Sequence, residues 1–121
     1  MILARQLASS LAMPIIIVDH VGTVIYWNEP AEALLAMRFD ETGEIPATVW
    51  TVQFRVDDTD KQQIPLDDWP LMIALKQRRP VSRTIRLRVT DGVWRQLMWT
   101  SIPMIASSGE FLGVQSVFWE S

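Results

Sequence analysis

The sequence contains no cysteine and only one histidine, His20. Without cysteine the chain can form no disulfide, no thiolate metal site and no cysteinyl bond to a cofactor. A lone histidine and the lack of a glycine-flanked nucleophile serine leave no serine hydrolase site. No acid/base pair or phosphate-binding glycine loop stands out either, so we expect a protein that is not an enzyme. The lack of cysteine fits a reducing compartment, and we expect a cytoplasmic location.

Long hydrophobic runs and clustered positive charge are also missing. The longest apolar run covers residues 13–18, far less than the roughly 20 residues of a membrane-spanning helix. The net charge is −3, whereas a nucleic-acid surface needs a clustered basic field. Asp57, Asp58 and Asp60 lack the spacing and the central glycine of a calcium loop. We therefore expect no membrane, nucleic-acid or metal binding.

The residues that are present describe one ordinary domain. Hydrophobic residues make up 49% of the 121 residues and charged residues 21%, the balance of a globular fold. Residues 1–12 place Leu3, Leu7 and Leu11 four apart, which predicts an amphipathic helix or linker before a domain over residues 13–121. Tryptophan is unusually frequent, at positions 27, 50, 69, 94, 99 and 119. This bulk has to be packed.

The first third of the domain predicts a hairpin followed by a helix. Residues 15–18 are β-branched, residues 19–22 have turn composition with His20 as a solvated turn residue, and residues 23–27 form the returning strand. Asn28 is a good N-cap, with Pro30 in the first turn of a helix over residues 28–37. From residue 38 to residue 63 the pattern has no clear period.

The last half predicts one more helix and three strands. Residues 66–79 have helical spacing, with Asp67 or Asp68 placed to cap the helix before Pro70. Strands are expected over residues 85–89, 93–102 and 111–119, joined by turns at 91–92 and 107–110. Together these elements predict an α+β fold with a five-stranded antiparallel sheet and helices covering one face.

Several strings in this order resemble the PAS domain family over nearly the whole chain. The strings are residues 15–19 with Gly22, residues 25–28 with 31–35, residues 65–75 with 80–81, and the closing 91–92, Pro103 and 109–114. The resemblance implies a curled sheet around a small cavity, in a sensory or regulatory module. It also implies a parent signalling protein, such as a histidine kinase or transcription regulator, with an effector domain that this fragment lacks. Fold alone does not select the ligand.

The resemblance allows cofactors to be considered by position. In the flavin-binding light-oxygen-voltage branch, the photoreactive cysteine has no counterpart here, and two flavin-contacting asparagines fall on Leu87 and Leu97. Leucine cannot hydrogen-bond a polar ring edge. The haem-ligating histidines of the family lie on its long helix, whereas His20 lies in the first turn. We expect no cofactor, neither flavin nor haem.

Strand alternation predicts which residues face the interior. Phe111, Gly113, Gln115 and Val117 should share one face with Leu97, Trp99 and Ser101. We therefore predict a pocket for a small apolar ligand lined by Leu87, Leu97, Trp99, Ser101, Gln115, Trp50 and Trp69. Two alternatives stay open: Gln115 could satisfy a backbone group within a filled core, and the tryptophans could be core that largely fills the cavity.

The opposite sheet face should be apolar and in need of cover. By the same alternation it carries Trp94, Met98, Ile102, Leu112, Val114 and Phe118. We predict a homodimer interface formed by Leu3, Leu7, Leu11, Trp94, Met98 and Phe118. Two functions follow: a sensor of a small apolar ligand that also dimerises, or an interaction module with a filled core and no ligand.

Overall fold

A tight hairpin begins the fold because a β-branched run meets a turn closed by glycine. The computed structural model describes residues 13–120, and it pairs β1 (Ile15–Asp19) with β2 (Val24–Trp27). The Asp19 carboxylate accepts hydrogen bonds from the backbone N–H groups of Val21 and Thr23, and Gly22 supplies a positive φ of 94°. The predicted hairpin is confirmed.

Asn28 connects this hairpin to α2 (Glu29–Leu35). Its side-chain oxygen accepts from the N–H of Ala31, as an N-cap does, and also from the N–H of Ile15, at 3.1 and 3.0 Å. Its Nδ2 donates to the carbonyl of Met13 at 2.9 Å. The predicted cap is confirmed, and the buried side chain also fixes where β1 starts.

The segment without a sequence period folds into short elements. These are α3 (Phe39–Thr42), α4 (Ala47–Gln53) and β3 (Arg55–Asp57), followed by a 3₁₀-helix (Leu66–Asp68) and α5 (Pro70–Gln77). The helix predicted over residues 66–79 is divided, because Trp69 is extended before Pro70. The predicted capping by Asp67 or Asp68 is wrong, since α5 has no side-chain cap, and Asp67 instead pairs with Lys76.

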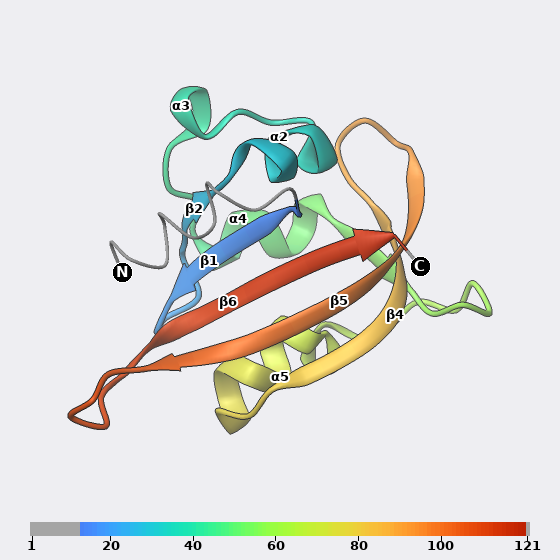
Figure 1. Cartoon of the computed structure of the whole chain (residues 1–121). Helices are drawn as coiled ribbons and strands as arrows, with labels where there is room; N and C mark the ends of the chain where they lie inside the picture. The colour runs from blue at the N-terminus through green and yellow to red at the C-terminus, as the bar shows by residue number, and fades with distance from the viewer. Residues whose placement is uncertain (1–12, 121) are drawn as a thin grey trace.

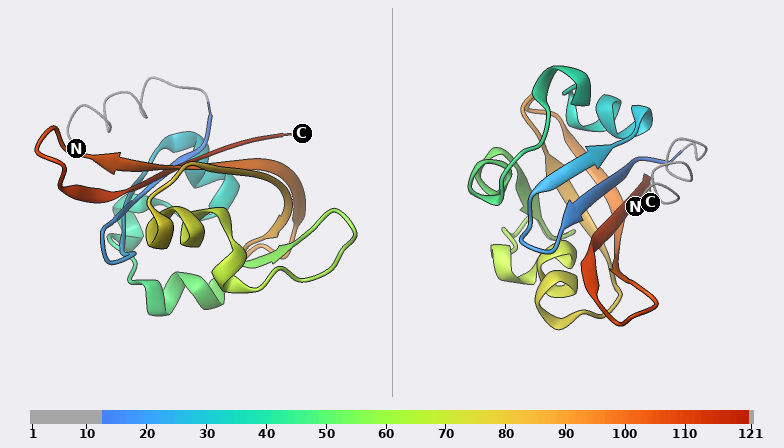
Figure 2. Two further views of the ribbon diagram at one scale, coloured as in Figure 1. Left: turned by 90° about the horizontal axis from the view of Figure 1, so that it is seen from below. Right: turned by 90° about the vertical axis from the view of Figure 1, so that its left-hand side faces the viewer.

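Three long strands complete the sheet: β4 (Val81–Arg88), β5 (Trp94–Ile105) and β6 (Phe111–Glu120). The strand order is β2-β1-β6-β5-β4-β3, so the sheet has six strands where five were predicted. The additional strand, β3, lies in the segment without a period. Figures 1 and 2 show α4 and α5 on one side of a strongly curved sheet, as predicted.

The sheet has two different faces. The inner face, toward the helices, forms the main core with Trp27, Trp50, Trp69 and Trp99. The outer face holds a smaller buried cluster of Ile15, Ile17 and Val117. Within residues 13–120 no helix is long and apolar enough to span a membrane.

The predicted register of β6 is wrong by one residue, and a β-bulge is the reason. Phe111 pairs with Ile105 and Gly113 pairs with Met104, so Leu112 is an extra residue that reverses the alternation beyond it. Phe111 packs against the core as expected, but Val114, Ser116 and Phe118 then face inward. Gly113 is required here, because a Cβ would lie 2.1 Å from the carbonyl oxygen of Val18.

Candidate functional site

The interior of the curled sheet is filled by aromatic rings in contact. Ring centroids are separated by 6.2 Å between Trp50 and Trp69, 6.1 Å between Trp69 and Trp99, and 5.1 Å between Trp99 and Phe118. These separations are typical of packed aromatic pairs. The row of rings runs from α4, past the start of α5, to β5 and β6, so it joins the helices to the sheet.

Three of the interior tryptophans are anchored by hydrogen bonds to backbone carbonyls. The indole N–H of Trp27 donates to Met37 at 3.1 Å, and that of Trp50 donates to Gly22 at 2.7 Å. The indole of Trp69 donates to Ile64 at 3.0 Å. The indole N–H of Trp99 is buried without an acceptor among the described residues. Trp99 is therefore the interior tryptophan whose donor is still available.

Only a small apolar cavity of about 30 Å³ remains among these side chains. A water molecule needs about 10–15 Å³ on this measure, and drug-sized ligands occupy about 300–1,000 Å³. The cavity is bordered by residues from β1, β2, the helical segment and the inner face of the sheet: Ile16, Val24, Trp27, Leu35, Met37, Ile45, Trp50, Phe54, Val56, Trp69, Leu71, Leu87, Trp99, Ser116 and Phe118. The interior has no room for a large ligand in this conformation.

The predicted pocket residues divide into three groups. Leu87, Trp99, Trp50 and Trp69 border the cavity, as their alternation and position indicate. Leu97 and Ser101 are buried on the same inner face but do not border the cavity. The prediction for Gln115 is wrong, because Gln115 pairs with Ile102 and Ile17 on the outer face.

Ser116 takes the inner position that was assigned to Gln115. Its hydroxyl lies 2.8 Å from that of Ser101, directly opposite on β5, and both side chains are buried. This cross-strand pair satisfies two hydroxyl groups within an apolar core. Sequence reasoning missed Ser116 because of the bulge, and it missed Ile45 and Val56 because their segment shows no period.

The predicted interface residues divide in the same way. Leu3, Leu7 and Leu11 lie outside the described residues. Trp94 and Met98 lie on the outer face, at alternate positions to the buried Leu97 and Trp99. The assignment of Phe118 to the outer face is wrong, since its ring packs on Trp99, and its neighbour Trp119 is the exposed residue.

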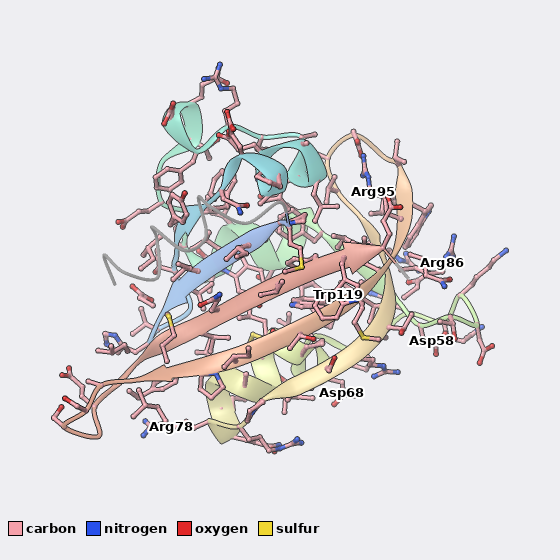
Figure 3. The ribbon with its side chains drawn as sticks, in the orientation of Figure 1. Asp58, Asp68, Arg78, Arg86, Arg95 and Trp119 are labelled. Carbon is pink, nitrogen blue, oxygen red and sulfur yellow. The ribbon has the colours of Figure 1, made fainter. Side chains whose placement is uncertain are left out.

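Arginine and tryptophan meet on the outer face of β4 and β5. The guanidinium carbons of Arg86 and Arg88 lie 4.9 and 5.4 Å from the ring centre of Trp94, the distance of a cation–π contact. Met98 and Trp119 follow as opposite neighbours along β5 and β6. Figure 3 shows Arg86 and Trp119 on the face of the sheet turned away from α5.

Arg95 occupies an inner-face position at the start of β5 and makes an ion pair. Its Nη2 donates to the Asp91 carboxylate at 2.9 Å. This hydrogen bond, together with the N–H of Val93, lowers the pKa of Asp91 below its ordinary value. The Nη1 of Arg95 has no partner in the described part of the chain. Residues 13–120 hold no group of three acidic or histidine side chains that could bind a metal ion.

Comparisons with known proteins find matches to the structure of this chain, whereas the searches with its sequence find none. No family model and no curated protein matches the sequence. A solved PAS domain from Colwellia psychrerythraea matches with a TM-score of 0.69 and 16% identity, over 100% of this chain and 98% of that one. The PAS domain of nitrogen regulation protein NR(II) from Vibrio parahaemolyticus matches with a TM-score of 0.66 and 15% identity, over 98% of both chains.

A fungal protein gives a further structural match. The blue-light photoreceptor Vivid, solved as its light-state dimer, has a TM-score of 0.65 and 12% identity, over 90% of this chain and 78% of that one. At identities this low the likeness concerns the fold alone. This chain therefore has the PAS fold.

Proposed function

We propose that this chain is a sensory or regulatory PAS module that works through protein contacts and holds no prosthetic group. Of the two functions that the sequence left open, the interaction module with a filled core is favoured. The observation that carries the proposal is the interior, where four tryptophans and Phe118 leave about 30 Å³. That volume is about a tenth of the smallest ordinary ligand pocket.

The residues at the cofactor positions support the same proposal. Leu87 and Leu97, which stand where the light-oxygen-voltage branch has asparagines, are buried and apolar, so a flavin ring edge would lose its hydrogen bonds there. His20 is exposed in the β1–β2 turn and lies outside the interior. A haem iron would find no histidine inside.

The contacts that we propose include a homodimer. The predicted leucine stripe, Leu3 to Leu11, would pack on the outer face, where Met98 lies and Ile102 and Trp119 are 43% and 40% exposed. Vivid, a structural neighbour, was solved as a dimer. A parent signalling protein with an effector domain remains part of the proposal, as does a cytoplasmic location.

Two measurements test the proposal on the full chain. Native mass spectrometry and absorption spectroscopy of freshly purified protein should show the bare polypeptide mass and no visible chromophore. Sedimentation at several concentrations should show a dimer that Leu7→Asp weakens, because it places an unpaired charge in the contact. Gln6→Asp is the matched control, since it adds the same charge beside the stripe. A stoichiometric bound cofactor, or equal effects of the two variants, would contradict the proposal.

A second candidate function is an interior sensor of a small neutral molecule with one hydrogen-bond acceptor. The unpaired indole N–H of Trp99, a residue that borders the cavity, favours it. Such a ligand would have to enlarge the cavity. In that case native spectra should show a small added mass, and Trp99→Phe should abolish it because phenylalanine has no donor.

A further inference from the structure

The outer face of β3, β4 and β5 gathers positive charge in a chain that is acidic overall. Arg86 and Arg88 project from β4 on this face, and Arg55 on β3 lies directly opposite Arg88. Asp57 is the one acid on the same stretch of face, and Arg55 pairs with its carboxylate at 3.3 Å. Positive charge is thus in excess at this end of the sheet, against a chain charge of −3.

The two outer-face arginines of β4 keep their hydrogen-bond donors available. Neither Arg86 nor Arg88 makes an ion pair or a side-chain hydrogen bond to another described residue, and both stack on Trp94. Stacking on an aromatic face positions a guanidinium while its N–H edge stays free to bind a carboxylate. Trp94 therefore holds two bidentate donors in place before any partner arrives.

The nearby acidic loop does not neutralise these donors. Asp58 is the closest acid after Asp57 in sequence, and its carboxylate accepts hydrogen bonds from the backbone N–H groups of Asp60 and Gln62 within its own turn. The Asp58 carboxylate is therefore occupied within its own turn, so an acidic partner for the arginines has to come from another molecule.

An apolar strip continues from the arginines along the same face. Met98 lies four residues after Trp94 on β5, with Trp119 directly opposite it on β6, and Ile102 follows. Trp119 and Ile102 are exposed. The face is therefore cationic and aromatic at one end and apolar beyond it, which is the complement of an amphipathic segment with acidic residues at one end.

We infer that this surface, Arg86, Arg88 and Trp94 with Met98 and Trp119, docks an amphipathic segment of a partner protein whose end over the arginines is acidic. The inference rests on the proposed function, because it names the chemistry of a partner for the outer face. Residues 1–12 of this chain do not supply that chemistry, since they contain Arg5 and no acid. A nucleic acid is disfavoured because the apolar strip offers no partner to a phosphate backbone.

The test uses the full chain and synthetic fluorescent peptides. The probe peptide carries leucines at helical spacing and glutamates in its first turns. Its two controls have the same leucines, with glutamines or with lysines in place of the glutamates. Fluorescence anisotropy should show tightest binding of the glutamate peptide, weakened by salt. Arg86→Glu with Arg88→Glu should weaken it at least about tenfold and should reverse the preference toward the lysine peptide.

Arg83→Glu is the matched control variant. Arg83 is exposed on the same strand but pairs in register with Trp99 at an inner-face position, so the same change of charge should alter the binding by less than about twofold. Thermal unfolding by circular dichroism checks that each variant is folded. Trp94→Ala should weaken binding as well, because the guanidinium groups lose their support.

Each of the following results would overturn the inference. If Arg83→Glu weakened peptide binding as much as Arg86→Glu with Arg88→Glu does, the loss of binding would come from net charge and not from this surface. Tighter binding of a single-stranded RNA oligomer than of the glutamate peptide would assign the surface to nucleic acid. Self-association that Arg86→Glu with Arg88→Glu abolishes would make a second copy the occupant. Equal binding of all three peptides would refute the acidic preference and leave the proposed function standing. Loss of all peptide binding would also refute the inference alone, because the proposed homodimer places Leu3 to Leu11 on the same face.

Discussion

The two faces of the sheet hold tryptophan in different ways. On the inner side, Trp27, Trp50 and Trp69 are buried, and each donates its indole N–H to a backbone carbonyl of another segment. On the outer side, Trp94 is stacked with arginines and Trp119 is 40% exposed. The inner rings close the fold on itself, whereas the outer rings leave surface for other molecules.

Under the proposed function, this difference divides the roles of the two faces. The indole rings leave about 30 Å³ in the interior, and each anchored ring ties two segments together. Information would then pass through the exposed face, where binding changes the environment of Trp94 and Trp119. The predictions below compare matched residues of the two faces.

The largest contrast is expected between two neighbours on β6. Phe118→Ala should lower the free energy of unfolding by about 3–5 kcal/mol, because the ring is buried against Trp99. Trp119→Ala removes a larger side chain but should cost only about 1 kcal/mol, since Trp119 is exposed. Urea denaturation of both variants measures the difference. Equal losses would show that the two sides of β6 are not as distinct as the register requires.

The same pair shows why part of the site could not be predicted. Both sides of β6 mix apolar and polar residues, since Val117 and Gln115 lie on the outer face and Phe118 and Ser116 on the inner one, so polarity does not mark the face. The inner and outer faces of β6 were assigned by alternation from Phe111, and the bulge at Leu112 reversed that alternation. On β5 the predicted assignment of side chains to the two faces is correct, because no irregularity separates Trp94 from Ser101.

Local signals predicted the first hairpin and the helix that follows it. The turn at Gly22 and the cap at Asn28 depend on residues close in sequence, so their chemistry is legible without tertiary contacts. The short helices α3 and α4 and strand β3 have no such signal; β3 forms by pairing with β4, and α4 is fixed by the burial of Trp50, and both are contacts with residues distant in sequence. The cavity-lining Ile45 and Val56 were missed for that reason.

A second contrast lies within the inner face. Trp50→Phe and Trp99→Phe delete the same atoms from two nearly fully buried side chains. Only Trp50→Phe leaves a buried carbonyl, that of Gly22, without its donor. Trp50→Phe should therefore be more destabilising by about 1–3 kcal/mol. Equal losses in urea denaturation would show that the indole anchor contributes nothing, and a larger loss for Trp99→Phe would place a hidden acceptor beside Trp99.

A third contrast compares two cross-strand hydroxyl pairs. Ser101 and Ser116 are buried on the inner face, whereas Ser82 and Thr100 form a pair of 2.7 Å on the outer face. Ser101→Ala should cost about 1–2 kcal/mol, because it leaves Ser116 with a buried unpaired hydroxyl. Ser82→Ala should change stability by less than about 0.5 kcal/mol.

A double-mutant cycle separates pairing from packing in the buried pair. Ser101→Ala with Ser116→Ala should cost less than the sum of the single variants, since both hydroxyls are then absent. Strict additivity would mean that the two hydroxyls do not depend on each other, and would contradict the pairing that the 2.8 Å separation indicates.

The smallest effect concerns the arginines of the two faces and depends on pH. Arg95, at an inner-face position, donates to Asp91 and lowers the pKa of that carboxyl, whereas Arg86 and Arg88 stack on Trp94 without a described acidic partner. A lowered folded pKa means that the pair stabilises the fold above the unfolded pKa, near 3.8, and that this contribution is lost as the pH falls through the folded value.

Asp91→Asn should therefore lower the melting temperature slightly at neutral pH, and the gap from the wild-type chain should close in acid. Arg86→Gln should produce no gap that closes in this way, because Arg86 stacks on Trp94 and makes no ion pair with a described carboxylate. Thermal melts of the three proteins from neutral pH to below about pH 4 measure both effects. A gap for Asp91→Asn that persists in acid would contradict the assignment to the ion pair, because both side chains are then neutral and either can still accept the N–H bond of Val93.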